Sequence, residues 1–332
     1  MLLTLTIFIV VLALIFDFIN GFHDKANEIA TIISTRALKP TQAVIFSSIM
    51  NLVGAMSFTG VAKTISDKVV HTADLPDNGT VVILAALLSA IFWNLLTWWI
   101  GMPSSSSHTL LGSIAGAGIA SSGFGIMNVE GFKEIIEGLL ASPVIAFLIG
   151  FILFKIFKRF LKNQNLVKTN NHFRKVQIAT AGLQSYSHGT NDAQKSMGII
   201  TMALIAANYQ DPGTGVHFWV QLSCAIAMGL GTAIGGWKII ETVGSKIMKI
   251  RPVDGVAADI SSAGIIFGAT LIGLPVSTTH VVSSSILGVG FSHRKRGVNW
   301  STAQRMIITW FITIPISAVV AGLFYYVLDF FL

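Results

Sequence analysis

The strongest constraint on this chain is a series of long apolar runs with few charges between them. Runs close to the roughly 20 residues that cross a bilayer as a helix lie at about 1–23, 41–62, 79–101, 139–157, 216–237, 258–274 and 301–330. Only 11% of the 332 residues are charged, whereas a soluble domain carries about 25%. We therefore predict an all-α, polytopic membrane protein.

Four further apolar pieces, at about 26–38, 105–121, 176–208 and 277–291, are too short or too interrupted for a full span. They predict half-helices, re-entrant segments or arms of broken helices, which gives about 10–12 transmembrane segments in all. The single cysteine, Cys224, excludes an internal disulfide and a cysteine-rich metal site. The basic residues are few and dispersed, so the net charge of +7 does not indicate a nucleic-acid partner.

Two pairs of matching motifs indicate an internal duplication. NGFHDKANEIATIIS (20–34) parallels HGTNDAQKSMGIITM (188–202), which sets Asp24 opposite Asp192 at an offset of 168. GMPSSSSHTLLG (101–112) parallels GLPVSTTHVVSS (273–284) at an offset of 172. Two matches at nearly one offset predict two repeats, at 1–160 and 176–332, joined by a basic linker at 161–175.

Loop charge predicts the orientation of these repeats, because basic residues gather in cytoplasmic loops. The segment 155–175 carries seven basic residues and no acid, and no Lys or Arg lies before Lys25 or after Arg305. We therefore expect a cytoplasmic linker and both termini outside, so each repeat crosses an odd number of times and one is upside down relative to the other. In each of three pairs of matched loops, one loop is richer in basic residues than its partner. The basic members are the loop with Arg36 and Lys39, 238–254 and 291–300, and their partners are 209–215, 63–78 and 121–138. The charge bias therefore reverses between the two copies.

Inverted repeats with a substrate site at their interface, near the middle of the membrane, are typical of secondary transporters. In both copies a Gly-x-Pro segment is followed by hydroxyl side chains where a helix is expected to start. Ser and Thr cap such a start, and the free N–H groups and the dipole of a helix N-terminus bind anions.

Two such helix starts, approaching from opposite repeats, predict a cage for a tetrahedral, phosphate-like anion. Its candidate ligands are Ser105, Ser106, Ser107, Ser277, Thr278 and Thr279. His108 and His280 recur in both copies and are expected to support the hydroxyls. The alternative is that these small residues only allow close helix packing.

Asp24 and Asp192 lie within or directly after apolar segments, and intramembrane carboxylates usually mark ion or proton pathways. Asn20, Asp24 and Asn27 share one face if the helix continues. Their oxygens, with carbonyls freed at a helix break, would suit Na⁺. The equivalent residues of the second copy are His188, Asp192 and Lys195. Lys195 is expected to meet the anion or to pair with Asp192, and a buried ion pair with a neighbouring lysine is the alternative role of each carboxylate.

Other polar residues within apolar segments are weaker candidates. Asn51, Asn94 and Gln184 are as suited to hydrogen bonds between helices as to ligand binding. Asp17, in the middle of the first span, is a further candidate on the ion pathway.

At these residues the chain resembles the inorganic phosphate transporter (PiT) family. The resemblance rests on NGFHDKANEIAT, STRALKP, GMPSSSSHTLLG, SHGTNDAQKSMGIIT and GLPVSTTHVVSS, and it covers both halves. It implies symport of inorganic phosphate with Na⁺ or H⁺ into the cell across the plasma membrane, an inverted-repeat fold and a homodimer. It also places Asn191 beside Asp24, Asn27 and Asp192 as an expected cation ligand. Lys195 and the short linker resemble the prokaryotic type.

The expected function is import of inorganic phosphate driven by a Na⁺ gradient, with the lipid bilayer as solvent and no cofactor besides the co-transported cation. A proton-coupled phosphate symporter and a sulfate permease of the same fold stay open as alternatives. An intramembrane hydrolase is disfavoured, because the Ser, His and Asp motifs are duplicated and no Gly-x-Ser-x-Gly elbow is present. A passive anion channel could not concentrate its substrate.

Overall fold

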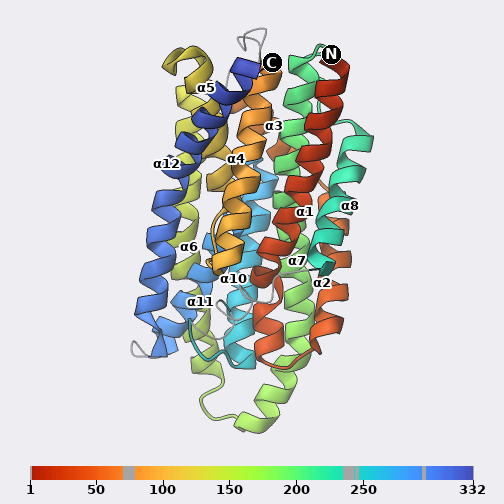
Figure 1. The fold of residues 1–332 in the computed structure, drawn as a ribbon. Helices are drawn as coiled ribbons and strands as arrows, with labels where there is room; N and C mark the ends of the chain where they lie inside the picture. Colours follow the sequence, from red (N-terminus) through yellow and green to blue (C-terminus); the bar gives the residue numbers. More distant parts are fainter. Residues whose placement is uncertain (1, 70–78, 235–242, 244–246, 294–296, 332) are drawn as a thin grey trace.

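The computed structural model describes residues 2–69, 79–234, 243, 247–293 and 297–331. Parts of the loops compared by charge, at 70–78, 238–242, 244–246 and 294–296, lie outside the described residues. Long helices run along most of the molecule (Figure 1): α1 (Leu2–Ser34), α6 (Val129–Phe160), α7 (Leu166–Ala206) and α12 (Trp300–Phe331). Shorter helices complete the bundle: α2 (Pro40–Ala55), α3 (Gly60–Lys68), α4 (Gly79–Ile100), α5 (Ser106–Ser122), α8 (Phe218–Ile234), α10 (Pro252–Leu271) and α11 (Thr278–His293).

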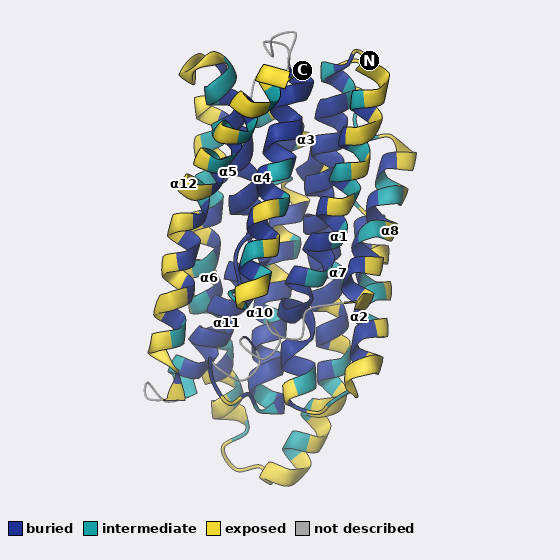
Figure 2. Cartoon of the chain, viewed as in Figure 1, coloured by how far each residue is buried: buried dark blue, intermediate teal, exposed yellow. Residues whose placement is uncertain are grey.

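Apolar side chains cover the outside of the bundle along its length, and several charged ones are buried within it. On α6, residues spaced four apart share one helix face, and Leu140, Val144, Leu148 and Ile152 are 50%, 58%, 50% and 52% exposed. Asp24, by contrast, is 1% exposed. Figure 2 shows buried residues along the centre of the bundle and exposed ones at its periphery. An apolar outside of this kind needs lipid as its solvent, which confirms the prediction of a multi-pass membrane protein.

Four of the described helices, α1, α4, α6 and α12, are each long and apolar enough to cross a bilayer. A fifth span results if α2 and α3, which meet at a bend of 64°, are counted as one broken helix. The predicted ten to twelve segments also include half-helices such as α5 and α11. The central helix α7 does not qualify on apolarity because much of it is polar and buried in protein instead of facing lipid.

Two helical hairpins enter the bundle from opposite ends (Figure 1). The hairpin of α4 and α5 occupies the upper part of the view and that of α10 and α11 the lower part. Their turns meet in the middle, where Ser107 Oγ donates a hydrogen bond to the Val276 carbonyl at 2.8 Å. Both chain termini lie at the upper end, opposite the connection between α6 and α7.

Helices of the two halves are interleaved. α1 packs along α8 and α7 along α2, while α5 packs on α12 and α11 on α6. Glycine permits the closest approaches: a Cβ on Gly116 would overlap the Ala318 backbone of α12, and a Cβ on Gly288 would overlap the Phe147 carbonyl of α6. Each half therefore completes the packing of the other.

Two helices are longer than the apolar runs indicate. α1 continues through Asp24 to Ser34, and α7 continues through Asp192 to Ala206. The pieces expected at 26–38 and 176–208 are therefore not separate arms, and no helix break frees carbonyls beside either carboxylate. Polar residues do not end these helices because the neighbouring helices bury them and supply hydrogen-bond partners. Of the basic segment 161–175, only 161–165 lies between helices.

Candidate functional site

The two hydroxyl segments lie at the starts of α5 and α11, as predicted. Ser105 is the N-cap of α5: its Oγ accepts a hydrogen bond from the His108 backbone N–H at 3.1 Å and lies 2.8 Å from His108 Nδ1. Ser277 Oγ accepts from the equivalent N–H of His280 at 3.3 Å. These two hydroxyls therefore serve to start their helices. The hydroxyls that follow reach other segments of the chain: Ser106, Ser107, Thr278 and Thr279.

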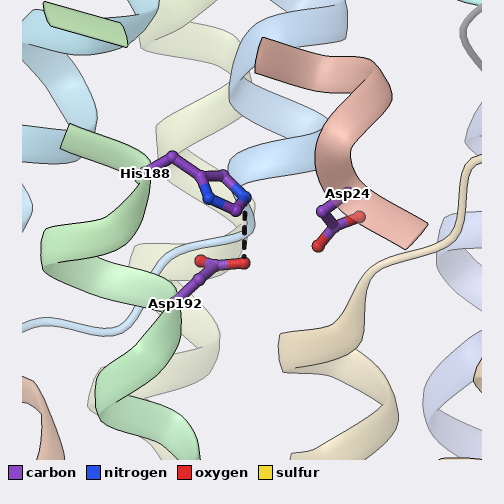
Figure 3. Close-up of side chains that lie close together, drawn as sticks. All are labelled: Asp24, His188 and Asp192. Carbon is purple, nitrogen blue, oxygen red and sulfur yellow. Dashed lines mark ion pairs between the residues drawn. The ribbon is translucent and has the colours of Figure 1, made fainter. Parts of the chain in front are cut away.

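The carboxylates of Asp24 and Asp192 lie close together between α1 and α7 (Figure 3). Ligand atoms of Asp24, His188 and Asp192 all lie within 4.8 Å of one another. Asn20 Nδ2 donates to Asp192 Oδ2 at 3.4 Å, and Asn27 Nδ2 donates to Asp24 Oδ1 at 3.3 Å. The uninterrupted helix α1 makes this possible, because residues four and seven apart lie on one face.

The hairpin tips bind the carboxylates in equivalent ways. Ser106 Oγ, from the α4–α5 hairpin, donates to Asp24 Oδ2 at 3.2 Å. Thr278, 172 positions later in the α10–α11 hairpin, donates to Asp192 Oδ2 at 3.1 Å. Each half of the chain therefore brings a hydroxyl of its own hairpin to its own carboxylate.

Two further contacts distinguish the carboxylates. Thr279 Oγ1 donates to Asp24 Oδ1 at 2.9 Å, so the second hairpin also reaches the first carboxylate. At Asp192, Oδ1 accepts a hydrogen bond from Lys195 Nζ at 2.7 Å, and Nζ also donates to Ser106 Oγ at 3.2 Å. The ion pair that we considered as an alternative is therefore present at Asp192.

Three of the candidate residues make no hydrogen bond to either carboxylate among the described residues. Asn191 braces the α10–α11 turn: its Nδ2 donates to the Leu274 carbonyl and its Oδ1 accepts from the Val276 N–H, both at 3.2 Å. Consecutive residues of a helix do not face the same way, which separates the Asn191 side chain from its neighbour Asp192. Gln184 accepts a hydrogen bond from α10 at 2.6 Å. Asn94 is buried, with no hydrogen-bond partner for its amide among the described residues. A ligand-binding role for these three stays a prediction.

Sequence reasoning missed one carboxylate beside the site. Glu28 is fully buried on α1, and its Oε1 lies 3.0 Å from His188 Nδ1. Asn51 Nδ2 donates to both Glu28 oxygens at 2.7 Å, so Asn51 contacts Glu28 and not the central carboxylates. The sequence could have identified Glu28 by its position four residues after Asp24, which puts both carboxylates on one face of a continuous helix.

His108 and His280 pack together behind the two tips. Their ring centroids are 4.5 Å apart, and His280 stacks on Trp310 of α12 at 4.0 Å. Both rings line an apolar cavity of about 460 Å³ between α6 and α12. These contacts join the two hairpins, and the expected support of the hydroxyls by His108 and His280 stays a prediction.

This arrangement can compensate a buried anion and a buried cation together. Hydroxyl hydrogens and the Lys195 ammonium are donors for an anion, and the carboxylate oxygens are ligands for a hard cation. The groups concerned are at most 2% exposed, so this conformation closes the site to both ends of the bundle. The cluster comprises Asp24, Ser106, Asp192, Lys195, Thr278 and Thr279.

A model of the phosphate transporter family matches residues 20–321, a span that includes both carboxylates and both hydroxyl segments. The chain belongs to the phosphate transporter family. Membership confirms the resemblance stated from the motifs, and it confirms a transporter rather than a hydrolase.

Curated members of the phosphate transporter family align over nearly the whole chain. A protein of Bacillus subtilis (strain 168), described as a probable low-affinity inorganic phosphate transporter, is 65% identical over 99% of this chain and 98% of its own length. A protein of Rhizobium meliloti (strain 1021) with the same description is 40% identical over 97% and 96%. A solved structure described as the sodium-dependent phosphate transporter superposes with a TM-score of 0.92 at 27% identity, covering 99% of this chain and 100% of that one.

Proposed function

We propose that this member of the phosphate transporter family imports inorganic phosphate across the plasma membrane together with Na⁺, as a secondary active symporter. The observation that carries the proposal is the buried cluster in which anion donors, Ser106 and Lys195, contact the carboxylates of Asp24 and Asp192. The descriptions of the relatives support phosphate as the substrate, and that of the similar structure supports Na⁺ as the coupled ion.

The physical basis of coupling is mutual charge compensation. A phosphate ion carries one to two negative charges near neutral pH, and removing it from water is costly unless opposite charge and donors replace the solvent. The carboxylates of Asp24 and Asp192 would repel it unless a cation is bound between them. Each ligand therefore stabilises the binding of the other, and the effect is reciprocal.

We further propose that the two halves are inverted repeats that rock against each other to alternate access. The opposed hairpins and the shared end for both termini support this architecture (Figure 1). Termini outside, a cytoplasmic α6–α7 connection and a homodimer belong to the same proposal. Loop charge supports the orientation, and the resemblance to the family is the support for the dimer.

Two alternatives use the same site. Protons would replace Na⁺ if a carboxylate binds a proton together with phosphate. Sulfate would replace phosphate if no acceptor contacts the anion, because phosphate near neutral pH still carries a proton to donate and sulfate does not. Two carboxylates within the cluster favour phosphate.

The test is uptake of radiolabelled phosphate by proteoliposomes that contain the purified chain. An inward Na⁺ gradient is compared with a proton gradient alone, each with and without excess unlabelled sulfate. Accumulation that requires Na⁺ and resists sulfate is expected. Accumulation driven only by protons would move the coupling to H⁺, and accumulation abolished by sulfate would change the substrate.

A matched pair of carboxylate variants tests whether the coupling of phosphate uptake to Na⁺ depends on this site. Asp24→Asn removes the charge with little change of shape and is expected to abolish Na⁺-driven accumulation. Glu137→Gln makes the same chemical change in a surface ion pair with Lys133, where the Glu137 side chain is 66% exposed, and is expected to leave uptake unchanged. Equal uptake by both variants would contradict the proposal.

A further inference from the structure

The two central carboxylates are equivalent by duplication but have different neighbours. On a helix, the residues four before and three after a carboxylate lie on its own face. Around Asp24 these residues are Asn20 and Asn27. Around Asp192 they are His188 and Lys195.

The side chains four before and three after Asp24 offer oxygen atoms to a ligand, while His23 lies beside the carboxylate, with Nδ1 3.0 Å from Asp24 Oδ1 and Nε2 3.2 Å from Thr97 Oγ1. Asn20 and Asn27 use their Nδ2 atoms as donors to the two carboxylates, while the Oδ1 atom of each is buried without a hydrogen-bond partner among the described residues. Buried polar atoms nearly always have a hydrogen-bond partner. Two unpaired amide oxygens beside a buried carboxylate therefore point to a ligand that is coordinated by oxygen atoms. A hard cation is such a ligand, since its preferred ligands are carboxylate and amide oxygens.

At the same two positions around Asp192, the side chains offer nitrogen atoms instead. Lys195 Nζ lies 2.7 Å from Oδ1, and His188 Nε2 lies 3.3 Å from Oδ2. The contact that Thr279 makes with Asp24 Oδ1 has no counterpart here, because its equivalent Ser107 donates to a backbone carbonyl. The ammonium of Lys195 therefore takes the place, beside Asp192, that a hydroxyl takes beside Asp24.

We propose that the Lys195 ammonium is a tethered cation that replaces a second co-transported cation, so that one phosphate is carried with a single coupled cation, bound at Asp24. The inference rests on the proposed symport and specifies its stoichiometry. Lys195 Nζ also donates to Ser106 Oγ at 3.2 Å. The fixed charge therefore reaches the hydroxyl cage, where a second mobile cation would otherwise offset the charge of phosphate.

The first measurement needs no variant. Proteoliposomes with the unaltered chain take up ²²Na⁺ and ³²P-phosphate together, and the ratio of the initial rates counts the coupled cations. The expected ratio is about one, with a hyperbolic dependence of phosphate uptake on Na⁺ concentration. A ratio of about two, with a sigmoidal dependence, would overturn the inference.

Exchanging the neighbours of the two carboxylates sharpens the test. Lys195→Asn gives Asp192 the amide that Asp24 has, and is expected to raise the ratio to about two. Lys195→Arg keeps the positive charge and is expected to keep the ratio near one. Asn27→Lys places an ammonium beside Asp24 and is expected to remove the dependence on Na⁺. A ratio that stays the same in Lys195→Asn would count against the tethered cation.

The outcomes separate this inference from the proposed function. A ratio of about two in the unaltered chain leaves Na⁺ symport intact and refutes only the role of Lys195. If protons drive uptake, the proposed Na⁺ coupling is refuted. The number of protons taken up per phosphate then tests the role of Lys195 in the same way. If no cation is needed, both are refuted.

Discussion

Replacing Thr279 with valine tests whether the hairpin tip is attached to α1 through its hydroxyl. Thr279 Oγ1 donates to Asp24 Oδ1 and accepts from Asn27 Nδ2, both at 2.9 Å, and the residue is 1% exposed. Valine keeps the branched shape and removes both bonds. Because the hydroxyl belongs to the second half of the chain and its partners to the first, the substitution weakens a contact between the halves.

The size of the effect follows from the two partners. A hydrogen bond to a charged group contributes about 1.5–3 kcal/mol and one between neutral groups about 0.5–1.5 kcal/mol. Asn27 keeps Asp24 as an acceptor at 3.3 Å, so its bond is only partly lost. We expect Thr279→Val to lower the free energy of unfolding by roughly 2–3 kcal/mol. If the hydroxyl also binds phosphate, affinity for phosphate falls by about tenfold or more.

Thr201→Val is the matched control. Thr201 is a buried threonine of α7, 4% exposed, whose hydroxyl has no hydrogen-bond partner among the described residues. Its replacement removes a buried hydroxyl without a partner among the described residues, so the free energy of unfolding is expected to stay the same or to rise by up to about 1 kcal/mol, and phosphate affinity is expected to stay as it is. Unfolding is measured by titrating SDS into detergent micelles and following tryptophan fluorescence, and affinity by calorimetry. Equal loss of stability in the two variants would refute the role given to Thr279.

Two other predictions concern helix packing and the carboxylate missed by sequence. Gly288→Ala is expected to destabilise the chain by about 1–3 kcal/mol, because the added Cβ would overlap the Phe147 carbonyl. Gly264→Ala is the control: its Cβ would meet no atom within 4 Å, and it is expected to stabilise the chain by about 0.5–1 kcal/mol. Unfolding in SDS compares the two variants. Glu28→Gln is expected to cost about 1–3 kcal/mol in the same assay, because an amide N–H then faces donors such as Asn51. Unchanged stability would show that Glu28 does not hold this network together.

Composition and duplication were enough to predict the membrane fold and the principal residues of the site. A chain with so many apolar residues and so few charges needs lipid as its solvent. Paired motifs at nearly one offset identify which polar residues lie together. Asp24, Asp192 and the hydroxyls after Pro103 and Pro275 come together as expected, although their transport roles stay predictions.

Helix continuity could not be predicted, because hydropathy describes a segment without its neighbours. The sequence around Asp24 resembles the end of a span, yet α1 continues because α7 and the hairpin tips bury its polar face and supply partners. Once the helix is known to continue, the consequences are geometric. Glu28 must share the face of Asp24, and Asn191 must turn away from Asp192.

The closed site also bears on which end of the bundle opens first. To expose the site, one hairpin tip must leave the carboxylates. The α4–α5 tip would give up two hydrogen bonds, both of Ser106. The α10–α11 tip would give up five: one of Thr278, two of Thr279, and the two that Asn191 of α7 makes with its turn. The costs therefore differ by three hydrogen bonds, on the order of 3 kcal/mol. This difference favours opening at the α4–α5 end, which faces outside in the proposed orientation.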